Sequence, residues 1–188
     1  MRIIAGCWKG RNLVSLKGSS TRPTYDRIKE AMFNILQGYI PDSLVLDLFA
    51  GTGNLGLEAL SRGCKKVVFV EKNPRAVRVL NKNRSNLGCL NQSHVICDDV
   101  FRVIRYLSGK ERFDLIFADP PYDKGLEILV LNAIAENDIL QPQGIIVLEH
   151  SSKVDQPDEV ENIKKIQTRK YGSTSISFFR KSRSDDNI

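Results

Sequence analysis

From residue 44 onward, short apolar runs alternate with segments of helical periodicity. Five runs predict buried strands, over residues 44–50, 66–71, 93–98, 113–119 and 144–150. Four helices are predicted between these strands. The first ends near Arg62, and the other three span residues 73–87, 99–107 and 126–136. Strand–helix alternation of this kind predicts an α/β fold built on a mainly parallel sheet with right-handed crossovers.

The two ends of the chain depart from this alternation. Residues 1–20 predict short strands broken by glycines, and a helix is predicted over residues 21–36 with Thr24 as its cap. Residues 163–172 and 173–182 predict two closing strands, joined as an antiparallel hairpin.

The basic residues of the chain are concentrated at its two ends. The net charge is +6. The first 39 residues carry seven Lys or Arg against Asp26 and Glu30, and residues 164–183 carry seven basic residues and no acid. The section between them, residues 40–163, has 14 basic and 18 acidic residues. Two basic ends around an acidic centre favour a polyanionic partner, most simply a nucleic acid.

A glycine loop follows the first predicted strand. Gly51, Gly53 and Gly56 have the G-x-G-x-x-G spacing that lets a nucleotide approach the backbone closely, and Glu71 follows at the distance of a ribose-binding carboxylate. Asp47, just before the loop, would repel a pyrophosphate but suits a cationic ligand without phosphate. The set therefore favours S-adenosylmethionine over a dinucleotide.

Two further carboxylates end the third predicted strand. Because the carboxyl ends of parallel strands face the ligand crevice, Asp98 or Asp99 could accept the adenine amino group of the cofactor. Asp99 could alternatively cap the helix that follows it. We keep both interpretations open at this point.

The fourth predicted strand stops at Asp119-Pro120-Pro121-Tyr122, on the same sheet edge as Asp47. An exocyclic amine of a nucleobase is a poor nucleophile, because its lone pair is delocalised into the ring. Asp119 and the carbonyl of Pro120, held by a stiff turn, could accept its two N–H hydrogens and favour a tetrahedral nitrogen. Tyr122 offers a flat face on which a flipped-out base can stack. We predict a catalytic role for these four residues.

The segments DLFAGTGNLGLEAL and DPPY together resemble class I S-adenosylmethionine-dependent amino-methyltransferases. The head of the chain, MRIIAGCWKGRNL and then TRPTYDRIKEAMFNIL, resembles the bacterial family that methylates the N2 amine of a guanine in small-subunit (16S) ribosomal RNA. This resemblance implies a Rossmann-like, mostly parallel sheet of seven strands with an antiparallel last strand, a small N-terminal β extension and helices on both faces. It also implies S-adenosylmethionine as methyl donor and S-adenosylhomocysteine as product.

The resemblance assigns roles to individual residues. Gly51, Thr52 and Gly53 would wrap the methionine part of the cofactor, Glu71 would hold its ribose and Asp99 would lie by its adenine. The predicted cofactor site comprises Asp47, Phe49, Gly51, Thr52, Gly53, Glu71, Asp98 and Asp99. Asp119 to Tyr122 would hold the target guanine.

The implied partner is ribosomal RNA, within the small subunit or an assembly intermediate of it. Thr21 to Thr24 would lie over the cofactor or the RNA. The residues predicted to bind RNA are Arg2, Lys9, Arg11, Arg22 and Arg27. We expect no metal site, because the cysteines are scattered, and no membrane span, because no apolar run approaches about 18 residues. The start of the chain shows no apolar signal-peptide core, so we expect a cytoplasmic protein, and we expect it to be a monomer.

We expect the 188 residues to form one methyltransferase domain, because no linker divides them. Within it, residues 1–40 would be a basic extension with a helix for RNA or cofactor contact, residues 41–183 the Rossmann-like core, and residues 184–188 a loose tail.

Four other functions are weighed against this prediction. A DNA adenine-N6 methyltransferase would use the same four residues at 119–122 but must read a duplex, and no added recognition domain is visible. A glutamine methyltransferase usually has Asn at the position of Asp119. An NAD-dependent enzyme is disfavoured by Asp47 and by the lack of a nearby hydride-transfer His or Lys. A non-catalytic RNA-binding domain gives no reason for the motif at 119–122.

Overall fold

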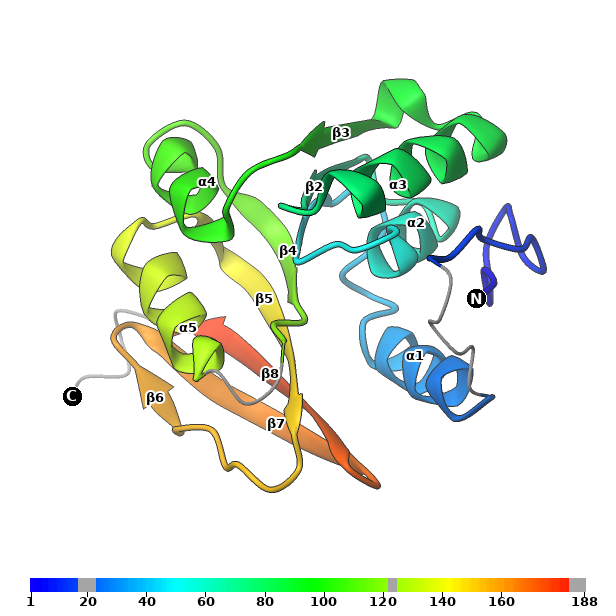
Figure 1. The fold of residues 1–188 in the computed structure, drawn as a ribbon. Helices are drawn as coiled ribbons and strands as arrows, with labels where there is room; N and C mark the ends of the chain where they lie inside the picture. Colours follow the sequence, from blue (N-terminus) through cyan, green and yellow to red (C-terminus); the bar gives the residue numbers. More distant parts are fainter. Residues whose placement is uncertain (17–22, 122–124, 183–188) are drawn as a thin grey trace.

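The computed structural model describes residues 1–16, 23–121 and 125–182, and its centre is an eight-stranded sheet of order β3-β2-β1-β4-β5-β8-β7-β6 (Figure 1). The strands are β1 (Leu44–Leu48), β2 (Lys66–Val70), β3 (Ser93–Ile96), β4 (Phe113–Ala118), β5 (Leu140–Ser151), β6 (Glu159–Val160), β7 (Ile163–Tyr171) and β8 (Thr174–Lys181). The predicted tail, residues 184–188, lies outside the described residues.

The strand directions confirm the predicted class of fold. Strands β3, β2, β1, β4 and β5 pair in parallel, and β8 is antiparallel to both β5 and β7. The sheet order reverses between β1 and β4, so their carboxyl ends flank the crevice where α/β sheets bind ligands.

Two details of the sheet correct the sequence prediction. The expected seven strands become eight, because the short β6 adds an antiparallel pairing to the start of β7. The expected strands of residues 1–20 reduce, in their described part, to an isolated antiparallel bridge between Arg2 and Asn12. Too few backbone pairs form there to build a ladder.

The helices are α1 (Pro23–Ile35), α2 (Asn54–Ser61), α3 (Pro74–Leu87), α4 (Val100–Leu107) and α5 (Leu126–Glu136), with a short 3-10 helix at Leu90–Gln92. Asn73 caps α3 as predicted, because its Oδ1 accepts a hydrogen bond from Arg75 N at 2.9 Å. The cap predicted at Thr24 is wrong: α1 already begins at Pro23, whose fixed φ suits a first helical position.

Helices cover both faces of the sheet, and each face has its own apolar core. Alternate residues along a strand serve opposite faces, so Val45 packs with α1 and α2 while Leu46 packs with α4 and α5. In Figure 1, α1, α2 and α3 lie on one side of the sheet and α4 and α5 on the other. No helix in the described ranges is long and apolar enough to span a membrane.

Candidate active site

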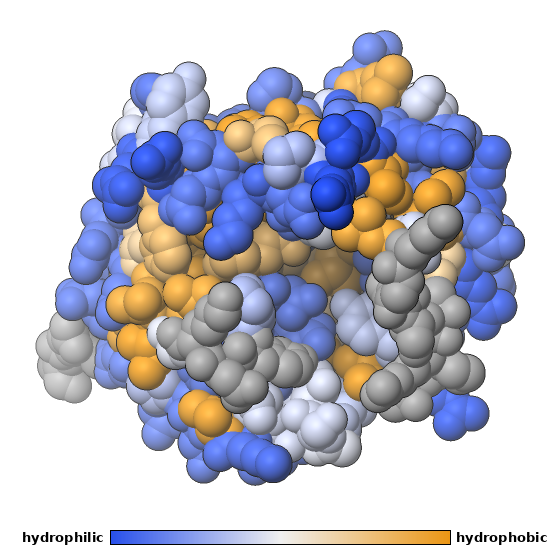
Figure 2. Space-filling view, in the orientation of Figure 1, coloured by the Kyte–Doolittle hydropathy of each residue, from blue (hydrophilic) through white to orange (hydrophobic). Residues whose placement is uncertain are grey.

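The carboxyl ends of β1, β2, β4 and β5 border a cavity of about 530 Å³. Six predicted site residues line it: Phe49, Glu71, Asp99, Asp119, Pro120 and Pro121. Figure 2 shows this face of the molecule, where apolar side chains gather around a hollow and hydrophilic side chains surround them. The structure therefore brings residues from the predicted cofactor motif and the predicted base motif to one cavity.

The glycine loop is fixed by the carboxylate of Glu71. Its Oε2 accepts a hydrogen bond from Gly51 N at 2.8 Å, and its Oε1 accepts one from Asn73 N at 2.7 Å. Since a carboxylate has about four acceptor positions, these two bonds leave capacity for the two hydroxyls of a ribose.

The last position of the loop, residue 53, requires glycine. Gly53 has φ +87° and precedes the first residue of α2, and a Cβ at this position would lie 2.3 Å from Leu80 Cδ1. Phe49, at the start of the loop, also has a positive φ of 60°. A left-handed conformation is uncommon for a phenylalanine, and such backbone strain is concentrated at functional sites. Thr52 is buried between the two glycines.

Asp47 lies beneath the loop rather than in its mouth. It is only 2% exposed, and its Oδ2 accepts a hydrogen bond from Gly56 N at 2.9 Å. Burial raises the pKa of Asp47 to about 7, the bond from Gly56 opposes this, and the charge of Glu71 adds to it. Asp47 thus holds the start of α2 and keeps a carboxylate that a nearby cation would stabilise.

Asp99 fits both interpretations that the sequence left open. Its Oδ1 accepts a hydrogen bond from Phe101 N at 3.0 Å and so caps α4, and the residue also lines the cavity. Asp98 accepts from Asp99 N at 2.7 Å and is 3.8 Å from Arg102. Of the two carboxylates, Asp99 is therefore the better placed to meet a bound adenine.

Asp119 follows directly on β4 and is half-buried. Burial raises the pKa of Asp119 well above its usual range, and the charges of Glu149 and then Asp47 raise it further. Pro120 is buried and Pro121 is exposed at the rim of the cavity. The fourth residue of the motif, Tyr122, lies outside the described residues.

The structure adds two residues that the sequence predictions missed. Glu149, near the end of β5, lines the cavity, and the same rule about carboxyl ends of strands could have found it. Tyr25 comes from α1, which precedes the whole alternating core, so no strand-edge rule points to it. Burial raises the pKa of the Tyr25 hydroxyl well above its usual range, and the charges of Glu149 and Asp119 contribute.

The predicted RNA-binding residues lie on the N-terminal side of the molecule. Arg2, Lys9 and Arg27 line a second cavity of about 670 Å³, although Arg2 also pairs with Asp26 at 3.1 Å. Arg11 is exposed nearby in sequence, and Arg22 lies outside the described residues, as does Thr21.

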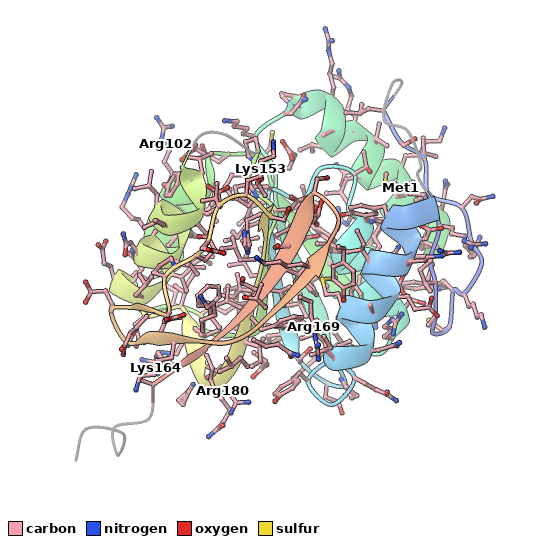
Figure 3. The ribbon with its side chains drawn as sticks, turned by 90° about the horizontal axis from the view of Figure 1, so that it is seen from below. Met1, Arg102, Lys153, Lys164, Arg169 and Arg180 are labelled. Atoms are coloured by element: carbon pink, nitrogen blue, oxygen red, sulfur yellow. The ribbon has the colours of Figure 1, made fainter. Side chains whose placement is uncertain are left out.

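The second basic end lies elsewhere on the molecule. Figure 3 shows Lys164 and Arg180 on the hairpin of β7 and β8, on the opposite side of the view from Met1. Lys164 and Arg180 therefore lie apart from the start of the chain.

Comparison with known proteins decides the family. A family described as conserved hypothetical protein 95 matches residues 1–180. This chain belongs to that family. Two relatives are YlbH of Bacillus subtilis, 37% identical over 96% of this chain and 99% of that protein, and ribosomal RNA small subunit methyltransferase D of Haemophilus influenzae, 41% identical over 79% and 78%.

The solved structures agree with this assignment. The Escherichia coli protein yhhF superposes with a TM-score of 0.86 at 27% identity, over 98% of this chain and 99% of that one. The relatives and the architecture together confirm the predicted resemblance to bacterial small-subunit rRNA methyltransferases and the predicted class I methyltransferase fold.

Proposed function

We propose that this protein transfers a methyl group from S-adenosylmethionine to the exocyclic N2 amine of a guanine in small-subunit ribosomal RNA. The observation that carries the proposal is the shared cavity, in which Glu71 and Asp99 lie with Asp119 and Pro120. Its volume of about 530 Å³ is in the range of small-molecule sites. The names of the relatives support ribosomal RNA as the substrate class.

The cofactor would occupy the part of the cavity next to the glycine loop. Glu71 would accept hydrogen bonds from the ribose hydroxyls, and Asp99 one from the adenine amino group. Gly51, Thr52 and Gly53 would hold the methionine part. Bound, the cofactor supplies an electrophilic methyl group on a sulfonium, and its positive charge would favour the ionised forms of Asp47 and Asp119.

The base would occupy the part of the cavity next to Asp119. The Asp119 carboxylate and the Pro120 carbonyl would accept the N2 hydrogens, so that the lone pair turns out of the ring plane. Held in this way, the nitrogen would face in line the methyl group that the cofactor would supply, so that the new carbon–nitrogen bond would replace the carbon–sulfur bond. The methylated amine is cationic at that moment, and it loses a proton to Asp119 or to solvent.

The N-terminal extension would hold the RNA. Arg2, Lys9, Arg11 and Arg27 would contact phosphates, with Arg22 in the same segment, and residues 41–183 would form the catalytic core. On this proposal a monomer acts in the cytoplasm, on a ribosomal subunit or its assembly intermediate.

The test is methyl transfer from labelled S-adenosylmethionine to small ribosomal subunits that lack the modification, with the product nucleoside identified by mass. N2-methylguanosine in the small-subunit RNA is the expected product. N6-methyladenosine, or label confined to DNA or protein, would overturn the proposal.

A further inference from the structure

Guanine differs from adenine in the hydrogens next to its exocyclic amine. On guanine the N2 amine is beside the N1–H, so two neighbouring groups donate. On adenine the N6 amine is beside N1, which only accepts. One acceptor such as Asp119 would hold the amine of either base, but a second acceptor at the neighbouring position would accept guanine alone.

Glu149 occupies such a position. In the parallel pairing of β4 and β5, Ala118 is opposite Leu148, so Asp119 and Glu149 are the next residues on two adjacent strands. Adjacent strands are about 4.8 Å apart, so carboxylates on the two side chains can converge on neighbouring atoms of one base edge. Both residues line the same cavity.

Charge effects show how closely the two carboxylates are coupled. Glu149 is the charged neighbour with the largest effect on Asp119, and it also has the largest charge effect on Tyr25. Two carboxylates at this distance repel each other, and a ligand edge with two adjacent N–H donors would relieve that repulsion. An edge that presents an acceptor to Glu149 would add to it.

The polar surroundings of the pair also fit a hydrogen-bonding base. The side-chain amide of Asn54 lies beside the Tyr25 hydroxyl, and its Oδ1 accepts a hydrogen bond from Lys29 Nζ at 2.9 Å. Asn54 thus helps to hold Tyr25, whose hydroxyl is near Glu149 and Asp119, as a further polar group beside the pair.

We propose that Glu149 is the specificity-determining residue of this site, and that its carboxylate accepts the N1–H of the target guanine while Asp119 accepts an N2 hydrogen. This inference rests on the proposed function and deepens it, because it names the group that separates guanine from adenine. Discrimination comes from the adenine N1 lone pair, which would face a carboxylate without a hydrogen between them.

The test replaces the target guanine by 2-aminopurine, which keeps the N2 amine but has an acceptor at N1. The modified position is first located by mass analysis of RNA fragments. Small subunits are then reconstituted with either base at that position, and single-turnover methyl transfer is measured on both. The wild-type protein should prefer guanine. Glu149→Gln, whose amide can donate to N1, should shift the ratio of the two rates toward 2-aminopurine by about tenfold or more.

Matched measurements separate the outcomes. Glu161 is exposed in the turn that connects β6 and β7, away from the site. Glu161→Gln should therefore leave the ratio of the two rates as in the wild type. Unchanged affinity for S-adenosylhomocysteine would show that Glu149→Gln is folded. An unchanged ratio of the two rates in the folded Glu149→Gln variant would overturn the inference. Equal methylation of guanine and 2-aminopurine by the wild-type protein would also overturn it, without any variant. A wild type inactive on guanine would instead overturn the proposed function.

Discussion

Two clusters of charged side chains in this molecule differ in how their charges are compensated. In the first, Lys29 and Glu58 form an ion pair at 3.1 Å with side chains 1% and 0% exposed, and Arg62 adds a bond to Glu58 at 2.8 Å. In the second, Asp47, Glu71, Asp119 and Glu149 gather at the sheet edge. Within the described ranges, neither Asp47 nor Asp119 forms an ion pair.

The first cluster holds structure. Glu58 also accepts hydrogen bonds from Ile4 N at 2.8 Å and Ala5 N at 3.0 Å, and Lys29 donates to Arg2 O at 2.7 Å. These contacts fasten the N-terminal segment to α1 and α2, and every charge in them has a partner inside the protein. In the second cluster, Asp47 and Glu71 accept hydrogen bonds from backbone N–H groups rather than from cationic side chains. We infer that ion pairing of buried charge marks the structural cluster, and that Asp47 and Asp119, which form no ion pair in the described ranges, mark the site.

The largest expected effect is on the stability of the first cluster. Glu58→Ala would leave Lys29 buried without its carboxylate, and removing one member of a buried pair costs about 3–5 kcal/mol. Urea unfolding should show this loss in the free energy of unfolding. The same substitution at Glu161, which is exposed, should change it by less than about 0.5 kcal/mol. Equal effects at the two positions would contradict the structural role.

The next effect concerns the pH dependence of the second cluster. The pKa of Asp47 is about 7 in the folded protein, against 3.8 for an ordinary carboxyl. The folded state therefore binds more protons than the unfolded state between these values, and stability falls as pH rises from about 4 to 7. Asp47→Asn should remove this contribution, which is a few kcal/mol at most because one pKa unit corresponds to about 1.4 kcal/mol. Urea unfolding from pH 5 to 8 checks it; parallel pH profiles for the two proteins would contradict it.

A smaller effect is expected in the helix that connects the two clusters. A Cβ at Gly56 would lie 2.3 Å from Cε1 of Phe69, whose ring is packed in the core. Gly56→Ala should therefore destabilise the fold by about 1–3 kcal/mol through overpacking. Gly38→Ala is the control, because nothing lies within 4 Å of its Cβ position. Thermal unfolding of both variants distinguishes steric crowding from a general effect of losing a glycine.

The smallest effect concerns the surface that the first cluster fastens in place. RNA binding should weaken as salt rises, and Lys9→Ala should lower the slope of log affinity against log salt by about one, as for the loss of one phosphate contact. Lys164→Ala, on the other side of the molecule, tests whether the second basic end takes part. An affinity that is flat between low and moderate salt would contradict the electrostatic role of the N-terminal segment.

The sequence predicted the parts of the fold and site that depend on local pattern. Alternating apolar runs and helical segments predicted the parallel strands β1 to β5, and the residue after each strand predicted Glu71, Asp99 and Asp119 at one cavity. Tyr25 could not be predicted in this way, because a helix outside the alternating core brings it to the site. The Lys29–Glu58 pair likewise depends on the packing of α1 against α2, which no local pattern encodes.

The most direct test of the catalytic role of the second cluster compares two properties of Asp119→Ala, its affinity for the cofactor and its rate of methyl transfer. The variant should bind S-adenosylmethionine about as tightly as the wild type, because Glu71 and the glycine loop are untouched. Its single-turnover methyl transfer to small subunits should fall by about 10²–10³-fold, the usual cost of losing one acceptor that acts in the transition state. Asp155→Ala, an exposed carboxylate outside the site, should keep full activity. An Asp119→Ala protein as active as the wild type would contradict the catalytic assignment of the second cluster.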